Sequence, residues 1–197
     1  GPGPYTDKLL DILDRYNVKA TFFVTNGKPD YQNLIAQEAQ RGHTVAIHSA
    51  SHDYAKIYQS VDAYFADFDE MNSIITAQTG KAADLVRFPG GSSNTISKKY
   101  CYGIMSQLVC AVEERGFRYC DWNVSSGDAG GTTSTSQVVA NVIEGIKSNN
   151  VSVVLQHDIK NFSVDAVEQI IQWGLSEGYT FLPMTSTTPM SHHGVNN

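Results

Sequence analysis

The stretch "TVAIHSASHDY", residues 44–54, decides the fold, because a short apolar run leads directly into two histidines. Residues 44–49 are nearly continuous in apolar character, which is typical of a strand buried on both faces of a parallel sheet. His48 falls at the end of this run and His52 follows it by four positions. The stretch therefore predicts a buried strand with a polar site at its carboxyl end.

Five further apolar runs have a similar length, and amphipathic helical patterns separate them. The clearest helical patterns lie in residues 5–17, 135–149 and 163–178, the last with Ser163 as its expected N-cap and Gly178 at its end. Strand followed by helix, repeated about six times, predicts an α/β fold with a parallel sheet. The five other strand candidates are residues 19–25, 85–90, 117–124, 151–158 and 180–185.

Polar side chains occur at or just after the ends of four different predicted strands: His48, Arg87, Asp121 and His157. In a closed barrel the carboxyl ends of the strands converge on one face, where active sites lie. Periodicity leaves an open sheet and a barrel as alternatives, and this placement favours a barrel with a single site.

The composition predicts one ordinary globular domain over residues 1–197, with 41% hydrophobic and 17% charged residues. A net charge of -6 without a basic cluster argues against nucleic acid or an anionic membrane as the partner. No apolar run approaches the roughly 18 residues that span a bilayer, and the first 20 residues lack a signal-peptide pattern. Cys101, Cys110 and Cys120 form an odd set that indicates neither a disulfide framework nor a zinc ribbon.

The pair His48 and His52 is a candidate metal site, because zinc favours imidazole nitrogen and a catalytic zinc usually takes three protein ligands. If residues 48–52 begin a helical turn, both rings face the same way. The alternative is a surface or capping pair. No third ligand is evident beside the two histidines.

Three further residues are candidates for acid–base chemistry or positioning. His157 in "LQHD" suits a general acid or base, or alternatively a structural histidine bonded to the backbone. A contact with Asp121 would stabilise its imidazolium form and raise the pKa of His157, although Asp121 also suits a local capping role. Arg87 in "RFPGG" can clamp a carboxylate and the glycines can offer a backbone N–H to an oxyanion, or the segment simply reverses the chain.

Taken in this order, the motifs "HSASH", "RFPGG", "DW" and "LQHD" resemble those of the polysaccharide deacetylase family, also known as the NodB homology domain or carbohydrate esterase family 4. The resemblance covers nearly the whole chain, and "GHTVAIHSASHDY" is particularly similar to bacterial members that act on cell-wall glycans. It implies a distorted (β/α) barrel.

The resemblance also implies a role for each matching residue. His48 and His52 resemble the metal ligands, and His157 resembles the catalytic acid. Asp121 resembles the carboxylate that tunes this acid, and Arg87 resembles the residue that orients the catalytic base.

The substrate-binding positions implied by the family are Trp122 and Leu155, which resemble the walls of an acetyl pocket, together with Pro89 and Gly90. The backbone N–H of Gly90 resembles the oxyanion donor. Family members carry a tyrosine at this position, so its replacement by glycine removes an aromatic surface from the sugar groove.

A second departure concerns the start of the chain. Family members carry a "TFDD" motif immediately before a segment like "GPGPYT", and its two aspartates act as base and third metal ligand. We therefore expect an N-terminally incomplete domain without its first barrel strand, whose missing ligand lies before Gly1.

The expected activity is metal-dependent removal of N-acetyl groups from N-acetylglucosamine residues, with peptidoglycan as the first substrate. Zinc is the first expectation for the metal, and cobalt, nickel and manganese are alternatives. The family implies a monomer that acts outside the cell or at its surface.

Three alternatives remain at this point. The domain could be a catalytically inactive glycan-binding module, or it could deacetylate chitin oligomers or acetyl xylan. A metal-free serine hydrolase would combine His157 and Asp121 with one serine, although no GxSxG elbow is present. Its candidate nucleophiles are Ser92, Ser93, Ser125 and Ser126, and no catalytic role is assigned to Asp128, Asp158, His43, His192 or His193.

Overall fold

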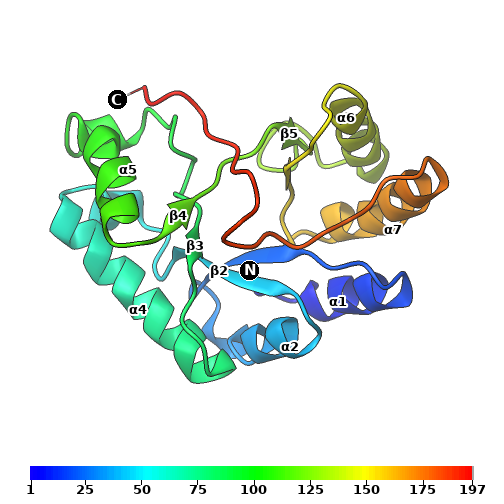
Figure 1. The fold of residues 1–197 in the computed structure, drawn as a ribbon, viewed down its shortest axis with the longest axis horizontal. Coiled ribbons are helices and arrows are strands. Elements are labelled where there is room, and N and C mark those ends of the chain that lie inside the picture. Colours follow the sequence, from blue (N-terminus) through cyan, green and yellow to red (C-terminus); the bar gives the residue numbers. More distant parts are fainter. Residues whose placement is uncertain (197) are drawn as a thin grey trace.

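The computed structural model describes residues 1–196, in which helices and short strands largely alternate along the chain (Figure 1). The α-helices are α1 (Thr6–Arg15), α2 (Leu34–Gln40), α3 (Tyr54–Ile57), α4 (Val61–Thr79), α5 (Ile104–Glu114), α6 (Thr135–Lys147) and α7 (Asn161–Ser176). The strands are β1 (Thr21–Thr25), β2 (Thr44–Ser49), β3 (Leu85–Val86), β4 (Arg118–Tyr119), β5 (Val124–Ser125) and β6 (Val154–Leu155). Two 3-10 turns, η1 (Pro29–Tyr31) and η2 (Ser97–Lys99), complete the set.

All strand pairs are parallel, which confirms the predicted α/β class. One sheet has the order β1-β2-β3-β4, and β5 pairs with β6 in a second sheet. The longest ladder joins β1 to β2 with Thr21 opposite Thr44. The chain passes from β4 to β5 through residues 120–123, so the two sheets follow one another around a distorted barrel, as expected.

Several predicted strands are much shorter than the apolar runs that indicated them. The run 117–124 is broken into β4 and β5, and the run 151–158 contributes only two residues to a ladder. The backbone leaves the sheets early because side chains and loops take over its hydrogen bonds. Asn123, for example, accepts from the N–H of Val153 through its side chain at 2.7 Å.

The sixth predicted strand, residues 180–185, is wrong, because this segment is extended but joins no sheet. Pro183 lacks an N–H and cannot take part fully in a ladder. Side chains of the first sheet bind the segment instead. The N–H of Met184 donates to Thr21 Oγ1 at 2.7 Å, and Thr44 Oγ1 donates to the Met184 carbonyl at 2.7 Å.

The predicted helices at residues 5–17, 135–149 and 163–178 correspond to α1, α6 and α7. The expected N-cap of the last helix is wrong: α7 begins at Asn161, and Ser163 lies inside it. The hydroxyl of Ser163 donates to Asp128 at 2.6 Å rather than capping the helix. Gly178, with φ of 83°, follows the end of α7 as predicted.

The core is divided between the two sheets. The larger cluster joins α1, α4 and α5 to the first sheet, with Ile47 and Met71 fully buried within it. A second cluster packs α6 against α7 beside the second sheet, around Val142 and Ile170. No helix within residues 1–196 has both the length and the apolar character that crossing a bilayer requires.

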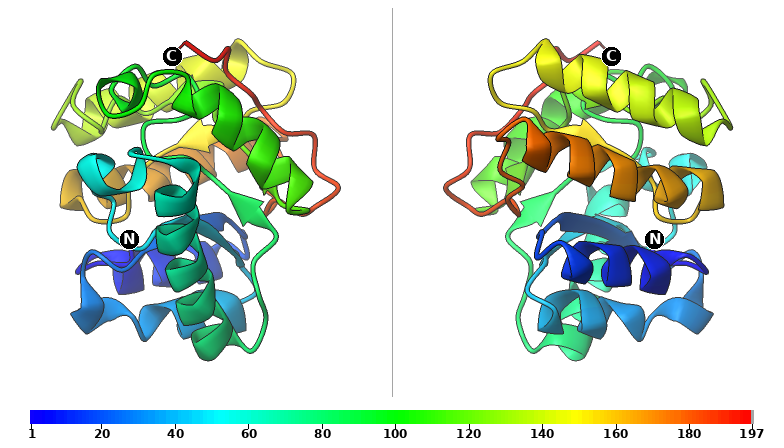
Figure 2. Two further views of the ribbon diagram at one scale, coloured as in Figure 1. Left: turned by 90° about the vertical axis from the view of Figure 1, so that its left-hand side faces the viewer. Right: turned by 90° about the vertical axis from the view of Figure 1, so that its right-hand side faces the viewer.

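The two side views place the functional segments on one side of the molecule. The amino terminus, the segment that follows β2 and the loop that leads into α7 lie together, whereas the C-terminal segment crosses the opposite side (Figure 2). The carboxyl end of β2 and the end of β6 therefore open toward a common face.

Candidate active site

His48 is held at the end of β2 with one ring nitrogen free. Its Nδ1 lies 2.6 Å from the carbonyl oxygen of Arg87. A carbonyl can only accept, so Nδ1 carries the proton and Nε2 keeps its lone pair. Burial, together with the neighbouring His52, lowers the pKa of His48 well below its usual value. The imidazole is therefore neutral and can serve as a ligand through Nε2.

His52 faces His48, with the two ring centroids 5.0 Å apart. The rings meet because of a turn and not because of the expected helix, since α3 begins only at Tyr54. His52 has a left-handed backbone with φ of 53°, and its N–H donates to Ser49 Oγ at 2.8 Å. Burial lowers the pKa of His52, which favours its neutral form.

These two imidazoles fit two positions of a metal site. Both are neutral, and the hydrogen bond from His48 Nδ1 to the Arg87 carbonyl is of the kind that orients ligating histidines. Among residues 1–196, however, no group of three or more His, Cys, Asp or Glu side chains is arranged to hold an ion. A third ligand before Gly1 stays a prediction.

His157 is paired with Asp128, which corrects the predicted pairing with Asp121. Its Nδ1 lies 2.7 Å from Asp128 Oδ1, and its backbone N–H donates to Oδ2 at 2.7 Å. The Asp128 side chain is 1% exposed and that of His157 is 34% exposed, so the pair is anchored inside and the imidazole reaches the surface. His157 lies near enough to His52 for its positive charge to lower the pKa of His52.

Asp128 is held in its ionised form. Burial alone would raise the pKa of its carboxyl, but the hydrogen bonds from His157 and Ser163 outweigh burial and lower the pKa to about 2. A carboxylate that stays charged can stabilise an imidazolium on His157.

The Asp121 carboxylate does not bond His157 but binds the loop that follows the arginine motif. It accepts from the N–H of Ser92 at 2.8 Å, from Ser92 Oγ at 2.5 Å and from the N–H of His193 at 2.8 Å. Asp121 is fully buried and fastens this loop to the C-terminal segment. The serine arrangement with His157 and Asp121 is therefore not formed.

Arg87 is buried, with 7% exposure, and carbonyl oxygens hold its guanidinium. Nε donates to the Cys120 carbonyl at 2.9 Å and an Nη donates to the Asp121 carbonyl at 2.8 Å. The guanidinium also lies 4.2 Å from the ring centroid of Phe23. Arg87 thus joins β3 to the end of β4, and its own carbonyl orients His48.

Gly90 has a left-handed backbone with φ of 79°. A Cβ atom at this position would be 2.7 Å from the hydroxyl oxygen of Tyr54. The Tyr54 ring lies 5.7 Å from that of His52, so an aromatic side chain from another segment occupies the space next to Gly90. The preceding residue, Pro89, is buried and its carbonyl accepts from Tyr58 Oη at 2.6 Å.

Trp122 lies next to the same loop. Its ring would be 3.0 Å from a Cβ atom on Gly91, and it makes an edge contact with His193 at 4.7 Å. Leu155 lies on β6 opposite Ser125, two residues before His157. Their role as walls of an acetyl pocket stays a prediction.

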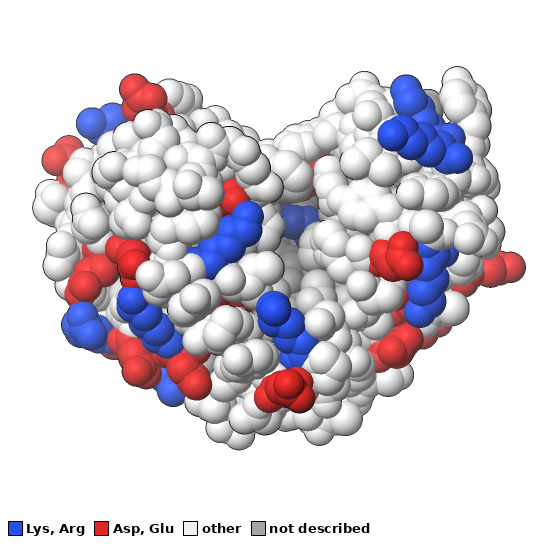
Figure 3. Space-filling view, turned by 180° about the vertical axis from the view of Figure 1, so that it is seen from behind, with Lys and Arg blue, Asp and Glu red and all other residues white. Residues whose placement is uncertain are grey.

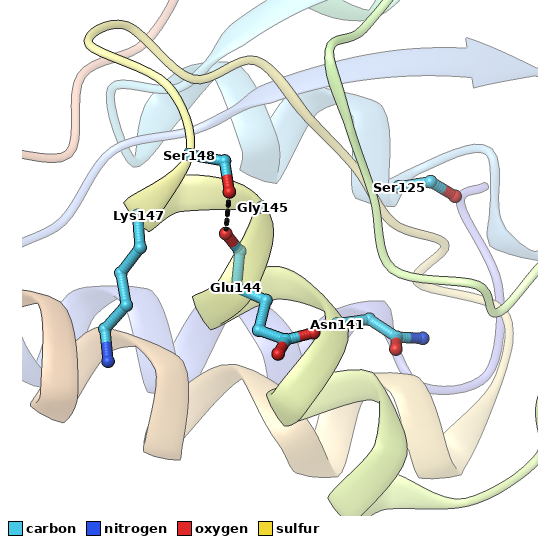
Figure 4. Close-up of a pocket in the computed structure, with 6 residues that line it drawn as sticks. All are labelled: Ser125, Asn141, Glu144, Gly145, Lys147 and Ser148. Carbon is cyan, nitrogen blue, oxygen red and sulfur yellow. Dashed lines mark hydrogen bonds between the residues drawn. The ribbon is translucent and has the colours of Figure 1, made fainter.

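The common face is hollowed between the lobe of α6 and α7 and the lobe of α4 and α5 (Figure 3). A separate, open cavity of about 600 Å³ lies along α6 (Figure 4). Six residues line it, and Figure 4 shows Ser148 bonded to the Glu144 carbonyl there. This cavity includes Ser125 but none of the histidines, so it is not the candidate active site.

Residues 1–102 match the polysaccharide deacetylase family, and the chain belongs to this family. It is 71% identical, with a TM-score of 0.99, to the crystal structure of the catalytic domain of peptidoglycan N-acetylglucosamine deacetylase from Eubacterium rectale, covering 100% of this chain and 90% of that one. It is 32% identical, with a TM-score of 0.82, to a polysaccharide deacetylase from Bacillus cereus, covering 100% of this chain and 92% of that one.

A peptidoglycan-N-acetylglucosamine deacetylase from Bacillus cereus is 32% identical over 187 residues, which cover 92% of this chain. The match spans 65% of that relative, less than two thirds of its length. The expected family and fold are thereby confirmed.

Proposed function

We propose that the protein is a metal-dependent hydrolase that removes N-acetyl groups from N-acetylglucosamine residues of a polysaccharide. One observation carries the proposal: the paired imidazoles of His48 and His52 lie 5.0 Å apart on the face where the His157–Asp128 pair emerges. Two neutral imidazoles beside a histidine–carboxylate pair support this proposal. The family membership supports the same chemistry.

His48 and His52 would hold a divalent cation, with zinc as the proposed ion and cobalt, nickel or manganese as alternatives. When bound, the cation supplies Lewis-acid polarisation of the acetamide carbonyl and activation of the attacking water. The chain's part is to present two neutral imidazoles in a fixed relation, which the Arg87 carbonyl and the turn at His52 provide.

His157 is the proposed acid that protonates the departing amine. Its Nδ1 is bound to Asp128, which leaves Nε2 to carry the transferred proton toward the substrate. The buried Asp128 carboxylate stabilises the imidazolium that this role requires, so Asp128 takes the role first expected of Asp121.

The remaining proposed residues bind or position the substrate. The exposed N–H of Gly90 is the proposed oxyanion donor, and Arg87 is a positioning residue that also orients the catalytic base. Trp122 and Leu155 are the proposed walls for the acetyl group, and Pro89 is a further proposed substrate-binding residue. Glycine at position 90 leaves the hydroxyl of Tyr54 as the nearest aromatic group to this part of the groove.

Peptidoglycan is the proposed substrate, because the Eubacterium rectale and Bacillus cereus relatives are named for it. A glycan of this kind places the proposed site of action outside the cell or at its surface. We further propose that the chain is one deacetylase domain and works as a monomer.

Acetate release tests the proposal. Peptidoglycan, chitin oligomers and acetyl xylan are supplied separately to the metal-loaded protein, and we expect release from peptidoglycan. Chelation should abolish it and added zinc should restore it, whereas full turnover in excess chelator would contradict metal dependence. Glycan binding in calorimetry without acetate release would favour the inactive glycan-binding alternative.

Substitution of the acid provides the matched test. His157→Ala is expected to reduce the rate by about 10²- to 10⁴-fold, the usual contribution of general acid–base catalysis. Glu114→Gln, which removes an exposed charge on α5, is the control and should leave the rate unchanged.

A further inference from the structure

A buried carboxylate on α4 binds the loop that connects the two histidines. Asp67 is 2% exposed, and its carboxylate accepts four hydrogen bonds from three consecutive residues of this loop. Ser49 Oγ donates at 2.6 Å, and the N–H groups of Ala50 and Ser51 each donate at 2.8 Å. The fourth bond comes from Ser51 Oγ.

One of these bonds continues to His52. The N–H of His52 donates to Ser49 Oγ at 2.8 Å, while the same hydroxyl donates its proton to Asp67. The carboxylate thus fixes the direction of the Ser49 hydroxyl and makes its lone pair available to His52. Ser51 has no such link, because its hydroxyl faces Asp67 and the N–H of Asp53.

His52 needs this support, because its φ of 53° lies in the left-handed region that residues other than glycine rarely adopt. A strained conformation persists only where the surroundings over-determine it. If His52 lost this left-handed conformation, the chain after Ser49 would continue in another direction. The His52 ring would then no longer face His48.

Asp67 also stays charged in this setting. Burial raises the pKa of its carboxyl, but the bonds from Ser49, Ser51 and Ala50 outweigh burial and lower it below the usual value. The nearest cation is Lys56, whose Nζ lies 3.9 Å away and is half exposed. Its interaction with Asp67 is therefore weak beside the four loop bonds.

We propose that Asp67 is a positioning residue for the metal site, which acts through Ser49 to keep the His52 imidazole beside that of His48. The inference deepens the proposed function and rests on its metal site. The hydrogen bonds of Asp67 go to Ser49, Ala50 and Ser51 and not to either imidazole.

The first experiment compares metal binding and loop protection in Asp67→Asn and in the wild-type protein. Calorimetric titration with Zn²⁺, and with Co²⁺ followed by its visible absorption, should show about 10- to 100-fold weaker binding, as for other residues that orient ligands. Amide hydrogen exchange at Ala50 and Ser51 should accelerate, because their acceptor is changed. Glu70→Gln, an exposed acid on the same helix, should alter neither quantity.

Two serine variants test whether Asp67 acts on His52 through Ser49. Ser49→Ala removes the hydroxyl that supports His52, whereas Ser51→Ala removes a hydroxyl that also bonds Asp67 but not His52. Ser49→Ala should weaken Co²⁺ binding by about tenfold or more, and Ser51→Ala by clearly less. If Asp67→Asn fails to fold, the two serine variants still test the proposal. Equal losses of Co²⁺ affinity in Ser49→Ala and Ser51→Ala would overturn it.

Failure of the proposed function has a different signature. If the wild-type protein binds neither ion, the metal site is refuted, whereas accelerated exchange at Ala50 and Ser51 in Asp67→Asn would still support the positioning of the loop. Unchanged exchange and unchanged metal affinity in Asp67→Asn would overturn the role of Asp67.

Discussion

At the scale of single residues, Asp128 is a buried charge that the fold stabilises. The pKa of its carboxyl is about 2 instead of the ordinary 3.8, because hydrogen bonds from His157 and Ser163 overcome its burial. A carboxyl whose pKa is depressed on folding contributes stability above its unfolded pKa. That contribution disappears as the pH falls through the folded pKa.

We therefore expect Asp128→Asn to lower the free energy of unfolding by about 2 kcal/mol at pH 5 to 6, the equivalent of this pKa difference. The gap between the variant and the wild-type protein should close between about pH 4 and pH 2. Urea denaturation across this range measures it. The exposed substitution Asp69→Asn should show no comparable closing, and a gap that is independent of pH would contradict the charge-based explanation.

Gly90 shows how close contact and backbone conformation act together. Gly90 and Gly80 have similar φ values of 79° and 76°, but a Cβ at Gly90 would be 2.7 Å from Tyr54 Oη, whereas nothing lies within 4 Å at Gly80. Gly80→Ala should lower the free energy of unfolding by about 1 kcal/mol, because alanine is strained in a left-handed backbone conformation. Gly90→Ala should cost more.

The difference in free energy of unfolding between Gly90→Ala and Gly80→Ala reports the contact with Tyr54. Urea denaturation of each variant measures it. Adding Tyr54→Phe to Gly90→Ala removes the nearest atom and should recover part of the difference. Equal costs for Gly80→Ala and Gly90→Ala would show that the loop moves aside freely.

At the scale of elements, the segment 180–185 lies against the first sheet without joining it. Its hydrogen bonds run through the side chains of Thr21 and Thr44 to the backbone of Met184. Met184 is 8% exposed and packs with Ala46 inside the barrel. Hydrogen bonds from side chains therefore replace the backbone hydrogen bonds that a strand would make here.

Each of the variants Thr21→Val and Thr44→Val keeps the shape of the side chain and removes one bond to Met184. We expect a loss of about 1 kcal/mol for each, and more for Thr21→Val if the Met184 N–H stays buried without an acceptor. A double-mutant cycle in urea measures their coupling through Met184. Thr95→Val, at an exposed position, is the control.

The sequence predicts the order of elements and much of the site, for physical reasons that also explain its failures. Apolar continuity located β2 to the residue, and it placed His48 and His157 at strand ends. The same continuity cannot show that the run 117–124 breaks at residues 120–123. Because of this break, the Asp121 carboxylate binds the Ser92 loop. Asp128 follows β5 and His157 follows the paired strand β6, so these two side chains meet.

At the scale of the whole molecule, one carboxyl limits stability at neutral pH. Glu38 on α2 is fully buried, and neither of its side-chain oxygens has a hydrogen-bond partner within residues 1–196. Burial raises the pKa of Glu38 well above its usual value. The folded state therefore holds a proton that the unfolded state releases, and stability falls as the pH rises above about 4.5.

Glu38→Gln should accordingly raise the free energy of unfolding near pH 7, because the neutral amide removes the need to bind a proton on folding. The gain should shrink as the pH falls through 4.5, because below this pH the Glu38 carboxyl is protonated in the unfolded as well as in the folded state. Urea midpoints between pH 4 and pH 8 test this. Glu114→Gln controls for net charge, and a destabilised Glu38→Gln at pH 7 would contradict the expectation.

The position of Gly1 has a practical consequence for handling the protein. Its nitrogen lies 3.4 Å from Asp158 Oδ1, on the same side of the molecule as the segment that carries His48 and His52 (Figure 2). Any polypeptide appended before Gly1 passes beside these imidazoles, so a polyhistidine purification tag there would compete as a ligand for whatever ion they bind. The C-terminal segment of the described residues crosses the opposite side of the molecule (Figure 2), so an affinity handle at the carboxyl end is preferable.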